Sequence, residues 1–552
     1  MAEMILPGTY IEVRAERLIA PGPVSVGNLG VVGTASKGPI GVPTILSSYA
    51  DTQEKFGRYD PWIDGQSDEL TLVRALEQAY LQGATTVFAV RVANGAQKSQ
   101  YTLNSSNGAC VTLQAKTEGT WGDELKVNVW DADEHPFIED EEHTGGGPIT
   151  LNHTPVVKSA RNRIRHFIDA TGVTKSLKIL YDDDPAAPAS GEVKINRATG
   201  ALTFGDGDPA AADVVTAFYT VDMSSAVKVT LQLGTSEEVY NVVSGDDLID
   251  DLARLSAWVD GVAETFSSEL PLKSSGANHF AQFSGGDNGA TGANYQEGLD
   301  KLLNENAHII LAAGQDESFG DELAAHCKAA SSDAYQRERI AVVGSKVGAT
   351  LDDIRGHNLN SDRLIYVAPG IKATDAAASP PVEVVLPGAY TAAAIAGLLS
   401  SLSAHFSPTN KVVSVGGLEQ RFNSAELAQL VQSRVLVLEE RLGIKIVKGI
   451  TTSTDSAWHQ ITTRRIVDYA KFGVRSAANP FIGKLNNARV REALKGSINS
   501  LLADMVDLEM LIAYELDVSA TRDQEIRGIA QVVMTLQPTF SIDFIRVTMF
   551  LQ

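Results

Sequence analysis

Both ends of this chain carry apolar segments that read as β-strands. Near the start, residues 8–13 read Gly-Thr-Tyr-Ile-Glu-Val, and a Pro- and Gly-rich stretch follows at residues 20–23. At the other end, residues 540–552 stay largely apolar to the finish. Chain ends are usually polar and frayed unless something holds them, and an exposed apolar strand pairs readily with another chain. Each terminal strand is therefore expected either to join a sheet of its own chain or to be added to a neighbouring subunit.

Length and composition indicate a globular protein with several domains. With 552 residues the chain is too long for one hydrophobic core, and three or four domains are expected. No apolar run reaches the roughly 18–20 residues of a membrane span, and the N-terminus lacks the pattern of a signal peptide. The only cysteines, Cys110 and Cys327, are far apart and form no CxxC motif. We therefore expect no disulfide framework or structural zinc, no stable membrane association, and synthesis in the cytoplasm.

The net charge of −22 is unevenly distributed and argues against direct nucleic-acid binding. Residues 411–552 hold 17 basic and 15 acidic side chains, whereas residues 1–410 hold 29 and 53. One interpretation is a surface that favours solubility. The other is that the acidic body faces outward while the nearly neutral C-terminal part faces partner proteins.

The pattern of elements predicts an α/β multidomain protein. Continuously apolar strands at residues 307–313, 339–344 and 363–368 alternate with helices, which is typical of a parallel sheet covered on both faces. Together with strands before residue 97 they predict a doubly wound α/β core, interrupted by a mainly β insertion. Residues 487–516 have apolar side chains at helical spacing and predict the longest helix. The expected parts are an N-terminal linking arm at 1–25, the core at 26–96 plus 281–402, the inserted outer domain at 97–280, and an α+β domain at 403–552 that ends in a linking strand at about 538–552.

A search for catalytic chemistry finds no site. The glycine clusters at residues 27–30 and 285–289 fit neither a dinucleotide fingerprint nor a phosphate-binding loop, and no nucleophile elbow is present. His326 and Cys327 are adjacent on a predicted helix, where neighbours point about 100° apart, so a packed thiol beside a surface imidazole is the preferred interpretation. Asp206 and Asp208 lack the spacing of a calcium loop. We expect no enzymatic activity, no cofactor and no metal site.

Several segments, taken in order, resemble the tail sheath proteins of contractile bacteriophages and related injection systems. The resemblance rests on five motifs that span nearly the whole chain. They are the PGTYIE opening at 7–12, GVVGTASKGP at 30–39, AKTEGTWGDEL at 115–125, FSGGDNG at 283–289, and PFIGK at 480–484 together with the helix after Asn487 and the apolar ending. Asp123 stands where the family usually has Asn. The insertion between about 125 and 280 is the part that the resemblance does not cover.

The resemblance implies a structural subunit with a subtilisin-like, non-catalytic core and exchanged terminal strands. Six subunits would form a ring around the tail tube, rings would stack, and contraction would drive the tube through the target cell envelope for genome ejection. Baseplate and tail terminator proteins are further expected partners. The protein would be made in the cytoplasm of a host bacterium and belong to the virion. The alternatives are the sheath of a non-viral injection system, a hydrolase that uses the α/β core, and an adhesin or capsid-type protein.

These expectations assign residues to three interaction surfaces. The N-terminal strand is expected to use Tyr10, Ile11, Glu12 and Val13. Charge suggests that part of the C-terminal domain faces the tube, with Arg489, Arg491 and Lys495 as candidates, although the helix that carries them could equally be a core helix. The C-terminal strand is expected to use Ile542, Phe544, Ile545, Val547 and Met549.

Overall fold

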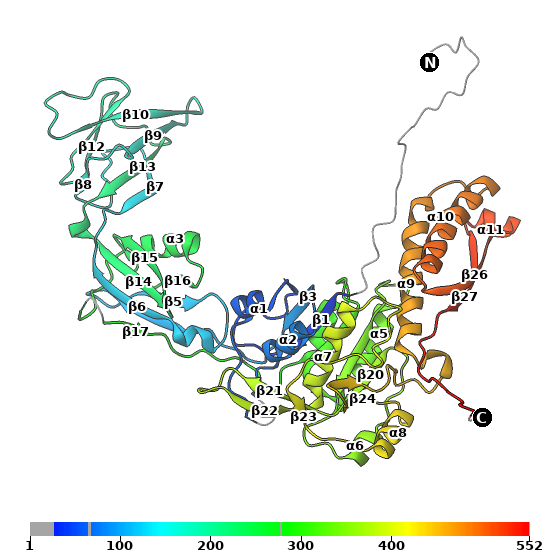
Figure 1. The fold of residues 1–552 in the computed structure, drawn as a ribbon. Coiled ribbons are helices and arrows are strands. Elements are labelled where there is room, and N and C mark those ends of the chain that lie inside the picture. Colours follow the sequence, from blue (N-terminus) through cyan, green and yellow to red (C-terminus); the bar gives the residue numbers. More distant parts are fainter. Residues whose placement is uncertain (1–26, 64–67, 277–278, 551–552) are drawn as a thin grey trace, which may run out of the picture.

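The computed structural model describes residues 27–63, 68–276 and 279–550. Figure 1 shows three parts along a bowed molecule: a β-rich arm, a central α/β core and a C-terminal module of helices and two strands. The arm comprises residues 97–287, and the C-terminal module residues 461–550. Within the described ranges, no helix is both long and apolar enough to cross a membrane.

The core is built on one sheet whose strands come from both sides of the arm in sequence. Its six central strands run parallel, and each edge strand is antiparallel to its neighbour. All residues of the strands at 29–33, 87–91, 340–344 and 364–368 are buried, which explains their continuously apolar sequences. In spatial order the sheet contains β2 (Thr44–Leu46), β3 (Val87–Arg91), β1 (Leu29–Gly33), β18 (Ile309–Asp316), β19 (Ile340–Gly344), β20 (Leu364–Ala368), β24 (Leu436–Glu440) and β25 (Ile444–Ile446).

Helices cover both faces of this sheet, as in a doubly wound α/β arrangement. Strand β1 shows the division, because Leu29 and Val31 join one hydrophobic cluster and Val32 joins the other. The mixed α/β, multidomain fold class is thereby confirmed. A small antiparallel sheet of β21 (Ile371–Asp375), β22 (Val382–Leu386) and β23 (Gly417–Leu418) adjoins the core. The helices are α1 (Tyr49–Phe56), α2 (Thr71–Leu81) and α7 (Gly388–Ser401) on the first face, and α4 (Tyr295–Leu302), α5 (Gly320–Ala330), α6 (Leu351–Arg355) and α8 (Ser424–Gln432) on the second.

The core sheet extends further along the sequence than the expected boundary at residue 402. Strand β24 pairs in parallel with β20, and β25 then folds back on β24. Leu436 and Val437 are fully buried in the two clusters that flank the sheet. The expected start of the C-terminal domain at residue 403 is therefore wrong. Only two residues of β24 are in register with β20, so its place in the core sheet depends on tertiary packing.

The arm contains two β modules, each with its own hydrophobic core. The chain enters and leaves side by side, since the backbones of Gln97 and Asp287 exchange hydrogen bonds of 3.0 and 3.1 Å. The inner module comprises β4 (Gln100–Asn104), β5 (Ala109–Ala115), β6 (Lys126–Asp131), β14 (Val227–Leu233), β15 (Ser236–Val242), α3 (Gly245–Leu255), β16 (Val259–Ala263) and β17 (Ala281–Gln282). The outer module comprises β7 (Phe137–Thr144), β8 (Val156–Val157), β9 (Arg163–Ile168), β10 (Val173–Tyr181), β11 (Glu192–Ile195), β12 (Leu202–Phe204) and β13 (Val214–Val221).

The C-terminal module packs two long helices against a two-stranded sheet. The predicted helix over 487–516 is corrected here, because the helix ends at Asp507 and a strand begins at Leu511. Glu509 has a φ of 60°, which breaks the helical path. The apolar spacing continued by chance into the strand. The elements are α9 (Ile461–Ala478), α10 (Ala488–Asp507), β26 (Leu511–Ser519), α11 (Arg522–Ile526) and β27 (Gln531–Pro538).

Candidate assembly interface

The sheet of the C-terminal module has two edges that no described strand covers. Strands β26 and β27 pair only with each other, in an antiparallel register that runs from Ala513 opposite Gln537 to Ser519 opposite Gln531. One face of this sheet packs against α10, while Ile512 and Val533 on the strands remain 58% and 50% exposed. A two-stranded sheet is marginally stable without further support. Its unpaired edges offer backbone donors and acceptors for additional strands.

The chain leaves β27 as an apolar segment that belongs to neither a helix nor a strand through Phe550. Its first residues are tied down, because Thr539 N donates to Met510 O at 3.1 Å and Gln460 Nε2 donates to the Asp543 carboxylate at 3.2 Å. Beyond this anchor the apolar side chains of the segment are mostly exposed. The predicted terminal strand is thus not formed within the chain itself, because no described strand lies beside it. The exposed apolar side chains are Ile542, Phe544, Ile545, Val547, Met549 and Phe550, at 71–88%.

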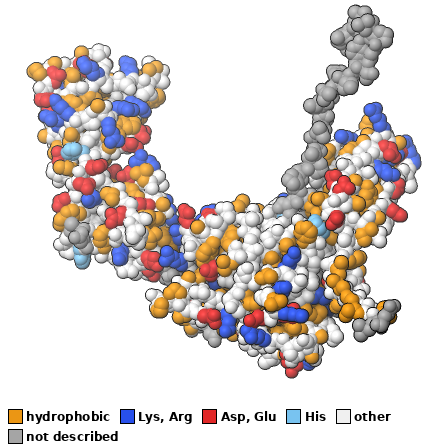
Figure 2. Space-filling view, in the orientation of Figure 1, with side chains coloured by type: hydrophobic (Ala, Val, Ile, Leu, Met, Phe, Trp, Pro, Cys, Tyr) orange, Lys and Arg blue, Asp and Glu red, His pale blue; other side chains and the backbone are white. Residues whose placement is uncertain are grey.

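The other two sets of predicted interface residues differ in whether the structure describes them. The N-terminal strand residues Tyr10, Ile11, Glu12 and Val13 lie outside the described residues. The predicted tube-facing residues all lie on the first turns of α10, at the end of the module where Figure 2 shows Lys and Arg side chains gathering. Arg489 is exposed, and Lys495 is half-buried. Arg491 instead contacts α11, with Nη1 donating to Glu525 Oε1 at 2.9 Å, so its charge is already paired within the chain.

Helix α9 joins the C-terminal module to the core through charged side chains. Arg363, just before β20, makes a two-pronged contact with Asp468 at 2.8 and 3.0 Å. Arg464 reaches the same carboxylate at 2.8 Å and also Asp362 at 2.9 Å. Asp468 and its two arginines are at most 12% exposed, so these charges depend on one another for compensation.

A second charged contact lies further along α9. The Glu338 carboxylate, whose side chain is 3% exposed, accepts from Lys471 Nζ at 3.0 Å and also from Arg475. These cations lower the pKa of Glu338 against the effect of its burial. The opposite, apolar face of α9 packs into the module through Ile466 and Ala470. Sequence reasoning missed this junction, although charges at 464, 468, 471 and 475 recur at helical spacing on a helix that is otherwise amphipathic.

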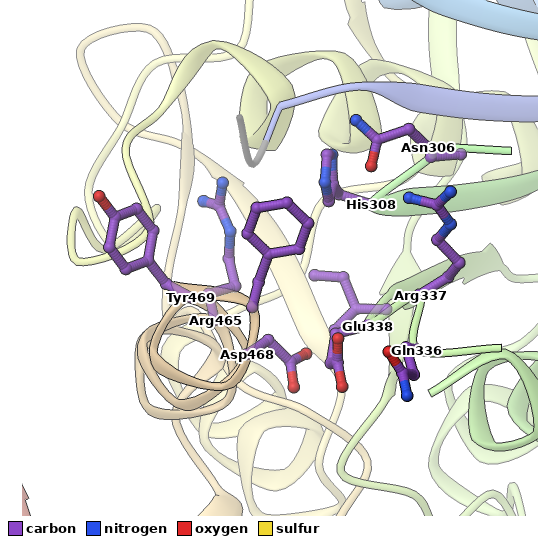
Figure 3. A pocket seen from close by; sticks show the side chains of 11 residues that line it. Asn306, His308, Gln336, Arg337, Glu338, Arg465, Asp468 and Tyr469 are labelled. Atoms are coloured by element: carbon purple, nitrogen blue, oxygen red, sulfur yellow. The ribbon is translucent and has the colours of Figure 1, made fainter. Parts of the chain in front are cut away.

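Between the two charged contacts lies a small cavity, seen from close by in Figure 3. On one side stand Asn306, His308 and the loop that carries Glu338, all at the amino ends of β18 and β19. On the other side stand Arg465 and Tyr469 of α9. Arg465 Nη2 donates to Leu402 O at 2.8 Å, which ties α9 to the end of α7.

The carboxyl edge of the core sheet, where α/β enzymes usually place their sites, holds a buried polar network. Glu69 accepts from Tyr390 Oη, and Thr71 Oγ1 lies 2.9 Å from Tyr295 Oη. Burial raises the pKa of Glu69 to about 7. The Ser345 hydroxyl at the end of β19 is buried. Among the hydrogen bonds of the described chain, no histidine is joined to a serine, threonine or cysteine side chain, the pairing that a hydrolase nucleophile requires.

The adjacent His326 and Cys327 are both buried, which corrects the expected surface position of the imidazole. Arg339 Nη1 donates to His326 Nε2 at 3.0 Å, and burial with this cation lowers the pKa of the imidazole to about 3. Burial also raises the pKa of the Cys327 thiol to about 12. Both groups are therefore neutral at physiological pH. No group of three or more metal-ligating side chains occurs in the part of the chain that the structure describes.

Two family models match the chain end to end over its second half. The phage tail sheath protein central domain covers residues 288–452, and the phage tail sheath C-terminal domain covers residues 453–552. Residues 288–552 are thus similar to the central and C-terminal domains of phage tail sheath proteins. The central-domain match begins directly after the arm, and the boundary at 452/453 falls between β25 and α9. The resemblance identified from the five sequence motifs is thereby confirmed.

Curated relatives agree with these matches. The tail sheath protein of Bacillus phage SP01 is 27% identical over 312 residues, which cover 53% of this chain and 53% of the relative. The tail sheath protein of Staphylococcus phage Twort is 29% identical over 181 residues, 32% of this chain and 30% of the relative. The matched region thus spans about half the length of the first relative and less of the second.

Solved structures extend the likeness in fold to nearly the whole chain. The sheath tail protein of Desulfitobacterium hafniense superposes with a TM-score of 0.59 at 14% identity, over 96% of this chain and all of that one. The sheath tail protein Lin1278 of Listeria innocua gives 0.57 at 14% identity, over 93% and 96% of the two chains. At such identities the likeness concerns the fold.

Proposed function

We propose that this sheath-family chain is the structural subunit of a contractile tail sheath. Subunits would assemble as stacked hexameric rings around a tail tube, linked by exchange of their terminal strands, and contraction would drive the tube through the target cell envelope for genome ejection. The observation that carries this proposal is the two-stranded sheet with open edges beside an exposed apolar chain end. The module offers positions for extra strands and the tail offers a strand.

Strand exchange suits a lattice that must change shape without coming apart. Backbone hydrogen bonds join strands irrespective of how the surrounding bodies are oriented, and each contributes about 0.5–1.5 kcal/mol net. A few such bonds per terminal strand give a link that survives the motion. The Pro- and Gly-rich residues 20–23 would let the bodies rotate about this link. Contraction would proceed spontaneously if the short, wide sleeve buries more surface between subunits than the extended one.

The remaining parts of the proposal concern partners and location. The tail tube protein would lie inside the sleeve against the nearly neutral C-terminal module, and baseplate and tail terminator proteins would cap the sleeve. The chain would be made in the bacterial cytoplasm and become part of the virion. The second candidate, the sheath of a non-viral contractile injection system, uses the same interfaces and differs only in what the tube delivers.

The decisive experiment removes the exposed apolar character of the tail without shortening it. The variant Phe544→Ser/Ile545→Ser/Val547→Ser is expected to stay folded, because these side chains are 71–84% exposed. It should fail to form sleeves when co-expressed with the tube protein, as seen by negative-stain electron microscopy. Deletion of residues 1–20 is expected to give the same result by removing the other strand.

The matched control changes three apolar side chains of the arm that are also exposed. Met223→Ser/Val239→Ser/Val262→Ser alters residues with 44–49% exposure and should leave sleeve formation intact. Long sleeves from the tail variant, or from the deletion of residues 1–20, would overturn the strand-exchange proposal. Wild-type protein that forms only discrete particles, with or without the tube protein, would favour the hydrolase alternative.

A further inference from the structure

The cavity at the junction of α9 and the core lies beside the point where the N-terminal segment enters the sheet. Asn28, the residue before β1, donates from its backbone N to His308 Nδ1 at 3.3 Å and from Nδ2 to Asn306 O at 2.8 Å. Both acceptors belong to residues that line the cavity. Figure 3 shows the strand that begins here passing above His308. The first described residues are thus fastened to the cavity wall.

Gly27 fixes the direction from which the chain arrives. A Cβ atom at this position would lie 2.3 Å from Ser400 O, so only glycine fits against the end of α7. Two and three positions after Ser400, the carbonyls of Leu402 and Ser403 accept hydrogen bonds from Arg465, another residue of the cavity wall. The chain therefore enters the core between the end of α7 and the cavity. Consecutive Cα atoms are about 3.8 Å apart, so the two to four residues before Gly27 can reach the cavity.

The chemistry of the cavity suits a small apolar side chain. Ala307, Ile340, Tyr469 and Phe472 supply apolar wall. Burial and nearby arginines lower the pKa of His308 to about 4, so this imidazole is neutral at physiological pH. Three of the four charged wall residues, Glu338, Asp468 and Arg465, are already engaged in the junction, and the fourth is Arg337. A volume of about 30 Å³ is too small for a metabolite-sized ligand.

We propose that the segment Pro23–Val26 of the same chain docks at this cavity and places a valine side chain in it. The segment lies outside the described residues. Its sequence is Pro-Val-Ser-Val, and in an extended chain Val24 and Val26 point to the same side while Ser25 points away. The root of the N-terminal arm would then be fastened where the C-terminal module meets the core. Tension on the N-terminal linking arm would act directly on that junction.

A disulfide scan on the full chain tests this placement. The variants Val24→Cys/Phe472→Cys and Val26→Cys/Phe472→Cys are oxidised mildly, and cross-links are identified by non-reducing electrophoresis and peptide mass spectrometry. The native Cys110 and Cys327 are buried and do not interfere. At least one pair should close within a single chain. The control pair Val26→Cys/Ile512→Cys, with Ile512 on the exposed face of the C-terminal sheet, should not.

A second measurement covers the case in which substitution of Phe472 disturbs the fold. Val24→Asp/Val26→Asp should lower the unfolding midpoint of the chain by about 2–4 °C, whereas Ser25→Asp should leave it unchanged. Equal effects of the two, absence of both cross-links, or cross-links only between chains would overturn the proposal, the last because a neighbour's segment would then be the occupant. Intrachain cross-links are read from single chains, so the result does not depend on whether sleeves form.

Discussion

The core sheet and the C-terminal sheet differ in how much of their faces and edges the same chain covers. Every residue of β1, β3, β19 and β20 is buried, and helices cover both faces of the sheet. The C-terminal sheet has two strands, an exposed face around Ile512 and Val533, and uncovered edges. The first sheet is enclosed by its own chain, while the second leaves backbone donors and acceptors open at its edges. If strand exchange occurs as proposed, the stable body and the assembly surface are separate structures.

The largest expected effect is the difference between a buried charge in the core sheet and an exposed charge in the C-terminal sheet. Val342→Asp puts a carboxylate at a fully buried position of β19, and we expect a loss of more than about 4 kcal/mol in the free energy of unfolding, with insoluble protein as the visible result. Val533→Asp, half exposed on β27, should change monomer stability by less than about 0.5 kcal/mol. Chemical denaturation of both variants measures the difference. Comparable losses in the free energy of unfolding for the two variants would contradict the difference between the sheets.

The junction between the two regions gives the next effect. Asp468→Asn leaves Arg363 buried without its carboxylate and leaves Arg464 with Asp362 alone, and breaking a buried ion pair in this way costs about 3–5 kcal/mol. We expect the C-terminal module to separate from the core, detected as much faster proteolysis between residues 446 and 461. Asp523→Asn removes a carboxylate from the exposed pair with Arg527 and serves as the control, with an effect below about 1 kcal/mol. Unchanged proteolysis of Asp468→Asn would mean that apolar contacts alone hold the module.

A smaller effect is expected from pH. Burial raises the pKa of Glu69 from its ordinary 4.5 to about 7. Between these values the folded core retains a proton that the unfolded chain releases, so the contribution of Glu69 to stability falls as the pH rises from 4.5 to 7. Glu69→Gln should therefore stabilise the core by roughly 3 kcal/mol at most above pH 7 and have little effect below pH 4.5. Thermal unfolding of both proteins across this range measures the difference, and a gain that is independent of pH would contradict it.

The smallest effect concerns contact with the tube. Arg489→Glu/Lys495→Glu changes two charges on α10 and should weaken co-assembly with the tube protein by roughly threefold to tenfold at low salt, with less effect at high salt. Arg491 is left unchanged because it already pairs with Glu525. Lys126→Glu/Lys175→Glu changes two exposed lysines of the arm, on β6 and β10, and is the matched control. Equal behaviour of the two variants would remove α10 from the tube-facing surface.

Sequence reasoning was effective where one periodicity or one motif decides the structure. The continuously apolar runs that became β18, β19 and β20 identified a sheet covered on both faces. The ordered motifs identified the resemblance to tail sheath proteins, which the two domain models confirm over residues 288–552. The role of the terminal strands remains a proposal, since residues 1–26 and 551–552 are outside the described structure and the tail is not paired within it.

The sequence was less informative where tertiary contacts decide. Strand β24 is in register with β20 over only two residues, so its place in the core depends on packing rather than pattern. The apolar spacing of Leu508 and Leu511 continued that of α10, and the positive φ of Glu509, which ends the helix, cannot be read from a residue type that normally favours helices. Likewise, Arg363 and Asp468 are 105 positions apart, and nothing local to either predicts their contact.

The side-by-side entry and exit of the arm has a practical consequence. Because Gln97 and Asp287 are joined by backbone hydrogen bonds and both arm modules have separate hydrophobic cores, the arm is in effect a detachable appendage on a two-stranded stem. A foreign domain whose own termini are adjacent could replace it, and in the proposed sleeve each subunit would then carry one copy of that domain.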